Sequence, residues 1–342
     1  MTRTPRRSVI ALVAGVGLLI GLALAEGLVR LFDLAPDLPS GSTKYVPDPY
    51  LPWKPMPLTV VRGRRGEFRH NSLGFRDVEH DREKPAGVFR ILGLGDSFTY
   101  GALSPFEKTF LYRLEEALNR RPGTHPRVEI IKTGVSRYFP EPERILLEHY
   151  GAPFSPDLIL VGFLPNDVID THEGIGAVRP DRSGVLLTSE AMGLGDFGYA
   201  IYRASHLARL TLWLWGVTRA KMSGAHEAEI YLANGFHERD WRTIEAEYSR
   251  MASIADRLHA RLVIVNIPQK GPWDKRKEYP AERLAQWASR NHAGFVDTLP
   301  YMRRASGGEP LYWKDDGHCT PAGYGVISTA IYDYLVENNM VP

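Results

Sequence analysis

The sequence predicts an α/β protein in which helices cover both faces of a central parallel sheet. Five short, mainly apolar segments follow Val88, and such runs are typical of strands buried on both sides. Amphipathic segments long enough for helices separate them, which is the alternation expected of a parallel sheet. The composition agrees with a globular chain, since 44% of the 342 residues are hydrophobic and 24% are charged.

The chain divides into an N-terminal segment at 1–34, an arm at 35–87 and a main domain at 88–342. The strands expected in the main domain are residues 89–94, 128–131, 158–161, 262–265 and 295–296. The expected helices are residues 110–119, 141–150, 241–259, 281–290 and 322–338. Prolines crowd residues 36–57, so the arm cannot form a long helix and is expected to lie extended over the main domain.

Residues 1–34 contain a candidate membrane segment. Three arginines precede residues 9–25, a run without any polar side chain. As a helix, this run would span roughly 25 Å, the lower limit for crossing a bilayer. The basic flank favours a cytoplasmic N-terminus and a translocated body. We expect an uncleaved anchor; the alternative is a signal peptide cut after the small-x-small sequence at residues 23–25, which would give a secreted protein.

An insertion at about 168–240 interrupts the alternation of strands and helices, because it is far longer than a normal connection. Within it, residues 201–217 are rich in Leu and Trp and predict one helix. We favour packing of this helix on the core, as apolar stripes usually do. A lid or a membrane-facing element is the alternative that its aromatic residues suggest.

The segment RILGLGDSFTYG at residues 90–101 carries the strongest chemical signal. It predicts a strand that ends at Gly95, followed by a turn that presents Ser97. Ligands bind at the carboxyl edge of open α/β sheets, where this turn lies. A serine there becomes a nucleophile when a base removes its proton and N–H groups face the developing oxyanion. On the turn alone, a serine that caps a helix would be the simpler interpretation.

A base and two carboxylates occur near the C-terminus, in the sequence WKDDGHCTP at residues 313–321. An aspartate two or three residues before His318 can orient the imidazole and leave its other nitrogen to act on Ser97. A solvated acidic turn is the structural alternative for such a sequence. The presence of both a serine and a histidine with its carboxylate favours catalysis.

These motifs resemble those of the SGNH (GDSL) hydrolases, a superfamily of esterases and acyltransferases with a flavodoxin-like three-layer α/β/α fold. GDSFTYG is similar to the first block of the family, in which Ser97 matches the nucleophile, and His318 matches the base. The resemblance implies an oxyanion hole formed by the N–H groups of Ser97 and Gly134 and the side-chain amide of Asn166. Each such donor is worth roughly 3 kcal/mol in the transition state.

The aspartate that orients His318 stays open between two neighbours. Asp315 has the usual D-x-x-H spacing of the family and is favoured, whereas Asp316 has the D-x-H spacing of some relatives. The sequence departs from the family at Leu164, where a glycine is usual, and Pro165 follows it. This change is expected to re-aim Asn166 or to narrow the acyl pocket.

The arm sequence HNSLGFRD at residues 70–77 resembles a segment that often precedes the GDSL block in membrane-anchored bacterial members. We interpret this segment as structural.

No metal and no cofactor are expected. Asp167, Asp170 and His172 are ligand types, but no second histidine or cysteine lies at ligand spacing, so a solvated loop is the better interpretation. The single cysteine, Cys319, excludes an internal disulfide and is more typical of a small buried side chain than of a redox switch. The formal net charge of +2 comes from the first 34 residues, and a neutral body argues against a nucleic-acid partner.

Together, these features predict a membrane-anchored, extracytoplasmic serine esterase. Ser97 would attack the ester, His318 would take its proton, and water would release the acyl group. The resemblance and the location favour O-acyl groups, above all acetyl groups, on envelope or exported polysaccharide. A lipid ester competes because of the Trp-rich helix. Two further function classes stay open: an O-acyltransferase with the same triad, and a non-catalytic membrane-anchored scaffold or complex subunit.

Overall fold

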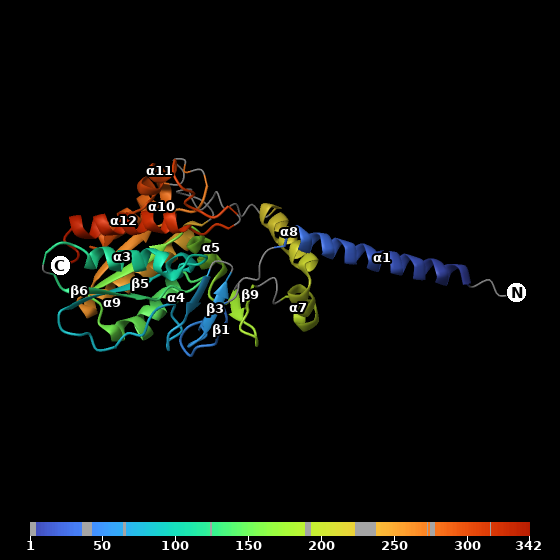
Figure 1. The fold of residues 1–342 in the computed structure, drawn as a ribbon, viewed down its shortest axis with the longest axis horizontal. Coiled ribbons are helices and arrows are strands. Elements are labelled where there is room, and N and C mark those ends of the chain that lie inside the picture. The colour runs from blue at the N-terminus through green and yellow to red at the C-terminus, as the bar shows by residue number, and fades with distance from the viewer. Residues whose placement is uncertain are drawn as a thin grey trace. The chain divides into compact units, whose positions relative to one another are not determined.

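The computed structural model describes residues 5–35, 43–63, 66–123, 125–188, 193–222, 237–271, 273, 278–314 and 316–342. The chain forms two compact units (Figure 1). The sheet unit comprises Ser42–Leu186 and Glu227–Pro342, and the N-terminal helix unit comprises Met1–Gly41 and Leu187–His226.

A parallel sheet of five strands forms the centre of the sheet unit. The strands are β5 (Val88–Leu94), β6 (Arg127–Lys132), β7 (Leu158–Phe163), β10 (Arg261–Asn266) and β11 (Gly294–Asp297). Their spatial order is β11-β10-β7-β5-β6, with every neighbouring pair parallel. The sheet therefore has the flavodoxin-like order, and its switch point lies between β5 and β7, where such folds bind ligands. The predicted α/β class and all five predicted strands are confirmed.

Alternate residues of the strands enter two separate cores, because side chains alternate between the two faces of a sheet. Ile91 of β5 packs in the core that is covered by α3 (Phe110–Asn119), α11 (Leu299–Ala305) and α12 (Pro321–Glu337). Its neighbour Leu92 packs in the opposite core, covered by α4 (Pro140–Leu146), α9 (Glu238–Leu258) and α10 (Tyr279–Arg290).

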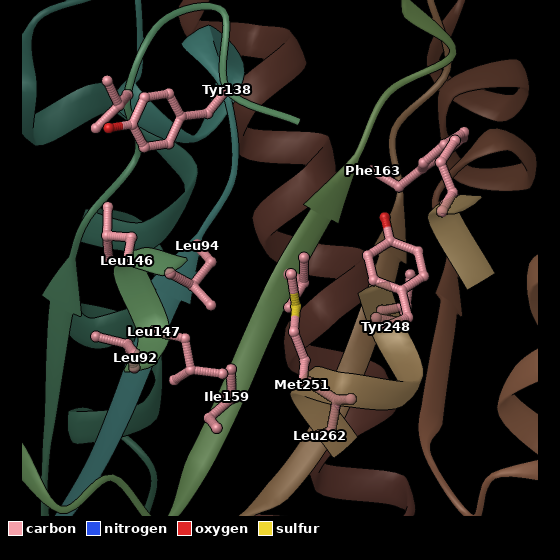
Figure 2. Close-up of a cluster of buried hydrophobic side chains, with 14 of the residues drawn as sticks. Leu92, Leu94, Tyr138, Leu146, Leu147, Ile159, Phe163, Tyr248, Met251 and Leu262 are labelled. Atoms are coloured by element: carbon pink, nitrogen blue, oxygen red, sulfur yellow. The ribbon is translucent and has the colours of Figure 1, made fainter. Parts of the chain in front are cut away.

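Figure 2 shows part of this second core, with Leu92 and Ile159 of the sheet beside Leu147, and with Met251 of α9 above β7. Burial of each such side chain stabilises the fold by roughly 1.5–3 kcal/mol. Both faces of the strands are covered, which explains why the strands appear in the sequence as mainly apolar runs.

The arm contains two short antiparallel pairs. Strand β1 (Tyr45–Val46) pairs with β2 (Lys54–Pro55), and β3 (Val60–Gly63) pairs with β4 (Gly66–Arg69). The buried side chains of Trp53 and Phe75 belong to the same core as Leu92, so the arm is part of the sheet unit. A tight turn at Gly74 brings the backbone close to Pro55: a Cβ at position 74 would lie 2.2 Å from the Pro55 carbonyl oxygen, and φ there is +90°.

The insertion begins with α5 (Asn166–Glu173) and continues through β8 (Val178–Pro180), β9 (Leu186–Thr188), α7 (Gly195–Ala204) and α8 (His206–Met222). The prediction of a single helix over residues 201–217 is wrong, because Ser205 has extended backbone and separates α7 from α8. Two aromatic side chains of α8, Trp213 and Trp215, are 50% and 53% exposed.

The N-terminal helix α1 (Pro5–Leu31) includes a candidate membrane span at Val9–Leu31, long and apolar enough to cross a bilayer. Signal sequences share these properties. Near its end, the carboxylate of Glu26 accepts hydrogen bonds from the Ser205 hydroxyl at 2.7 Å and from the backbone N–H of Leu207 at 2.8 Å. Glu26 thereby caps α8 at its N-terminus, where a helix favours negative charge. The one acidic residue in this apolar helix therefore attaches α8 to it.

Candidate active site

Ser97 lies at the carboxyl edge of the sheet, directly after β5. Gly95 makes the turn with φ at +149°, and a Cβ there would lie 2.0 Å from the Thr99 hydroxyl oxygen, so only glycine fits. Ser97 is the first residue of the short helix α2 (Ser97–Tyr100). The carboxylate of Asp96 caps this helix by accepting the N–H of Phe98 at 2.8 Å. The turn therefore presents Ser97 beside the switch point of the sheet.

The loop before α12 supplies a histidine that contacts Ser97 and a carboxylate that contacts this histidine. Nε2 of His318 lies 2.7 Å from Oγ of Ser97. On the other side of the ring, Nδ1 of His318 is hydrogen bonded to the carboxylate of Asp316, which also accepts the His318 backbone N–H at 2.8 Å. Asp315, the aspartate favoured from the sequence, lies outside the described residues. Among the described residues, Asp316 is the one whose carboxylate contacts the His318 ring.

This arrangement has the connectivity of a serine nucleophile, a base and an orienting carboxylate. With the Nδ1 proton held by Asp316, the lone pair of Nε2 faces Ser97 and can accept its hydroxyl proton. The ring of Phe98 lies beside the imidazole, with centroids 5.0 Å apart. Ser97 and His318 are both half-buried, so a substrate can reach them from solvent.

Gly134 packs against the backbone of the helix that carries Ser97. The N–H groups on either side of Gly134, at Thr133 and Val135, donate to the carbonyls of Gly93 and Gly95 at 2.9 and 3.0 Å. These bonds extend the β5–β6 pairing past the strand ends and bring Gly134 to α2. A Cβ at position 134 would lie 2.2 Å from the nitrogen of Tyr100, so no other residue fits there.

Asn166 begins α5, just after β7, and its amide nitrogen donates to Asp170 at 3.1 Å. Burial raises the pKa of Asp96 to about 6, while hydrogen bonds from the Phe98 N–H and the Asn166 side chain act in the opposite direction. The Asn166 amide is therefore close to the turn that holds Ser97. All three residues proposed for the oxyanion hole thus belong to segments that end at the same edge of the sheet.

The departure at Leu164 is a feature of packing. Leu164 is fully buried in the core beneath α3 and α12. Its N–H donates to the Asp167 carboxylate at 3.1 Å, and its carbonyl accepts the Asp167 N–H at 3.0 Å. This local turn starts α5 at Asn166 in spite of the missing glycine.

The arm segment at residues 70–77, which is interpreted as structural from its sequence, contacts the C-terminal end of α2, the helix that carries Ser97. The buried guanidinium of Arg76 donates to the carbonyls of Tyr100 at 3.1 Å and of Ser104 at 2.6 Å. Nε2 of His70 is hydrogen bonded to the Tyr100 hydroxyl at 2.9 Å. Burial lowers the pKa of His70 to about 4, so this histidine is neutral at pH 7. The arm thus fixes the end of α2.

Two acidic side chains are buried close to this region. Glu143 and Asp167 are both fully buried, and neither carboxyl oxygen of Glu143 has a hydrogen-bond partner among the described residues. Burial raises the pKa of both groups well above the usual range, and the nearby Asp96 carboxylate also disfavours a charge on each of them. No sequence pattern indicates this burial, because Glu143 lies in a helix whose other acidic residues look like a solvated face.

The three residues considered as a metal cluster do not form one together. Asp167 bonds to the backbone of Leu164, and Asp170 accepts from Asn166 and pairs with Arg137 at 3.4 Å. His172 instead meets side chains from a distant segment. Cys319 is buried beside the base, and burial raises the pKa of its thiol.

Comparison with known proteins yields one family match. A family model described as "GDSL-like Lipase/Acylhydrolase family" matches residues 94–326, more than half of the chain. No curated protein sequence matches the chain.

Several solved structures are similar to the chain at low sequence identity. They include TesA, with 12% identity, coverage of 72% of this chain and 97% of that chain, and a TM-score of 0.44. A catalytic mutant of Axe2, an acetylxylan esterase from Geobacillus stearothermophilus, has 13% identity, coverage of 72% and 94%, and a TM-score of 0.43. The esterase EstA from Pseudoalteromonas sp. has 13% identity, coverage of 73% and 98%, and a TM-score of 0.42. These similarities are too weak to add to the family match.

Proposed function

The chain belongs to the GDSL-like lipase/acylhydrolase family and is a serine ester hydrolase of that type, and we propose that Ser97, His318 and Asp316 form its catalytic triad. The observation that carries this proposal is the 2.7 Å approach of His318 Nε2 to Ser97 Oγ, with Asp316 on the opposite nitrogen. Nucleophile, base and orienting group are thus in hydrogen-bond contact, as covalent catalysis requires.

In the proposed reaction, Ser97 Oγ attacks the ester carbonyl carbon while its proton passes to Nε2 of His318. His318 then gives that proton to the leaving alkoxide, which leaves an acyl group on Ser97. A water molecule loses a proton to His318 and attacks the acyl carbon. The bond between that carbon and Ser97 Oγ then breaks, His318 returns the proton to Oγ, and the carboxylic acid leaves. Asp316 stays ionised throughout and stabilises the imidazolium through Nδ1.

We propose that the oxyanion is held by the N–H groups of Ser97 and Gly134 and by the Asn166 amide. Packing of Gly134 on α2 and the closeness of Asn166 to Asp96 support this assignment. The Asn166 amide donates to Asp170 at 3.1 Å and also hydrogen bonds to Asp96, so one of its N–H groups would leave a carboxylate to reach the oxyanion. The two backbone N–H groups are fixed in advance by the fold and need no reorganisation during the reaction.

The preferred substrate is an O-acyl group, above all an acetyl group, on envelope or exported polysaccharide. The basic flank and the apolar helix α1 support a membrane-anchored enzyme whose sheet unit lies outside the cytoplasm. A lipid ester is the second candidate, favoured by the half-exposed Trp213 and Trp215 on α8, which Glu26 attaches to the end of α1. An O-acyltransferase would use the same triad with a sugar hydroxyl in place of water.

The test is labelling of the full chain in detergent with a fluorophosphonate probe, followed by peptide mapping. We expect a label on Ser97 that is lost in His318→Ala. Activity against acetyl and long-chain esters, with and without a sugar acceptor, then separates the substrate classes and distinguishes hydrolysis from transfer. A folded sample that takes up no label would contradict the triad and favour a non-catalytic scaffold.

A further inference from the structure

Three potential metal ligands meet at the end of α5 that is remote from Asn166. His172 lies in the last turn of α5, His237 immediately precedes α9, and Asp240 lies in the first turn of α9. His237 and Asp240 are three residues apart, a spacing that places two side chains on one face of a helix. His172 is 65 positions earlier in the sequence than His237, and only the fold brings it to them.

Both histidines approach the same carboxylate oxygen. Nδ1 of His172 lies 3.0 Å from Oδ2 of Asp240, and Nδ1 of His237 lies 2.9 Å from that oxygen. One ligand atom from each of the three residues lies within 4.8 Å of the others. The two rings are perpendicular, with centroids 5.5 Å apart, so their nitrogen atoms converge without stacking.

These separations match a tetrahedral metal site. Bonds of about 2.0–2.1 Å in a tetrahedron place neighbouring ligand atoms roughly 3.3 Å apart. Both distances to Asp240 are within a few tenths of an ångström of that value. Imidazole nitrogens combined with one carboxylate are a preferred donor set of Zn²⁺ and similar divalent transition metals, and three protein ligands leave one position open.

The surroundings favour a site that is shaped before an ion binds. The side chains of His237 and Asp240 are 6% and 9% exposed, whereas that of His172 is 47% exposed, which leaves an entry from solvent. The start of α9 is held by Arg283, whose guanidinium donates to Glu238 at 3.1 Å and lies over the Trp241 ring. His237 and Asp240 are thus held in place, and His172 lies on the solvent side of the site.

We propose that His172, His237 and Asp240 bind a divalent transition-metal ion, with Zn²⁺ as the first candidate and the fourth position open to solvent beside His172. The ion would join the end of α5 to the start of α9. Asn166 lies six residues before His172, roughly 9 Å along the helix axis. At this separation the ion does not reach an ester bound at Ser97, so its role at that site would be to steady the helix that carries Asn166.

The experiment uses the full chain in detergent, stripped with a chelator and titrated with ZnCl₂ by calorimetry at pH 7.5. We expect one ion per chain at this site and a rise in Tm that grows with free Zn²⁺, because an ion that binds only the folded state stabilises it. Co²⁺ in place of Zn²⁺ is expected to give the intense visible absorption of a tetrahedral site.

The decisive variant is His172→Ala, because an exposed side chain can be removed without disturbing the core. Loss of a residue that only hydrogen bonds to a metal ligand lowers metal affinity roughly 10- to 100-fold. Because His172 is itself a ligand, we expect the Zn²⁺ affinity of this variant to fall by at least that much. His292→Ala, which removes another exposed histidine, is the matched control, and His318→Ala separates any binding at the triad. If Zn²⁺ and Co²⁺ do not bind, or bind equally well to His172→Ala, the three residues are a hydrogen-bonded cluster and the proposal is wrong.

Discussion

Two histidine–aspartate pairs in the sheet unit invite comparison, since each places Nδ1 of a histidine on an aspartate carboxylate. In the first, His318 and Asp316 belong to one short loop, and the free nitrogen of the ring contacts the Ser97 hydroxyl at 2.7 Å. In the second, Asp240 receives the Nδ1 atoms of both His172 and His237. Both sites contain the same histidine–aspartate pair, but the third group is a serine hydroxyl in the first and a second imidazole in the other.

The third group decides the chemistry that each pair supports. A hydroxyl opposite an imidazole lone pair can lose its proton and become a nucleophile. A second imidazole beside the same carboxylate offers no group to activate, but it adds a lone pair that a metal ion can accept. A histidine–carboxylate pair alone therefore identifies neither function, and substitutions that change one member at a time separate the two.

The largest effect is expected when the hydroxyl is removed from the first pair. Ser97→Ala should lower the rate of ester hydrolysis by roughly 10⁴-fold or more, because no other group forms the acyl-enzyme. The free energy of unfolding should stay within about 0.5 kcal/mol, since Ser97 lies outside both cores. Ester kinetics and denaturant unfolding check this, with Ser253→Ala as a control. Hydrolysis that persists in Ser97→Ala would assign the activity to another residue.

The carboxylate of the first pair gives the next largest effect. Asp316→Asn should lower kcat by roughly 10³- to 10⁴-fold, because an amide at this position no longer stabilises the imidazolium or the correct tautomer. Asp315→Asn is the matched neighbour and should retain most of the activity. Steady-state kinetics of the two variants decide between the D-x-H and D-x-x-H spacings. The reverse order of effects would restore Asp315 as the orienting residue.

A smaller effect is expected at Asn166, on the helix that carries one residue of each site. Asn166→Ala should lower kcat by roughly 10²- to 10³-fold with little change in KM, the typical loss for one oxyanion donor. Glu173→Gln, at the other end of α5, is the control for changes of the helix itself. A loss confined to KM would show that Asn166 binds the substrate in its ground state and does not stabilise the oxyanion.

The first pair could be found from the sequence because its parts lie within short motifs. The apolar run of β5 places Ser97 at the sheet edge, and the loop before α12 carries His318 with its carboxylates. Spacing does not supply the direction of each side chain in that loop, so the choice between the two adjacent aspartates stays a prediction for the paired variants to decide.

The second pair was beyond sequence reasoning for a different reason. His172 is a recognisable ligand type, but its own neighbourhood in the sequence holds no second histidine. His237 lies near the other end of the insertion and meets His172 only through the packing of α5 on α9. The break at Ser205 was missed likewise, because the contact that stabilises it comes from Glu26 in a remote helix. Local sequence patterns predicted the strands, whereas the features that they missed depend on contacts between residues far apart in the sequence.

The smallest effect is expected for a substitution of Glu143. Unlike the aspartates of the two pairs, its carboxyl group has no histidine partner among the described residues. Burial raises its pKa well above the ordinary value of 4.5, so the folded state keeps the proton that the unfolded state loses above that pH. Stability from this group is therefore fully present below pH 4.5 and is lost as pH rises toward the raised value. Glu143→Gln, which mimics the protonated form, should raise the free energy of unfolding at pH 8.

The expected gain is about 1–3 kcal/mol at pH 8, the range for a buried polar group without a partner, and it should shrink at pH 5. Denaturant unfolding of the variant and the wild type at both pH values measures this difference, and titrations shared by the two proteins cancel. Glu141→Gln, in the first turn of α4, controls for the loss of charge. A gain that is equal at both pH values would contradict the raised pKa of Glu143 and with it the prediction.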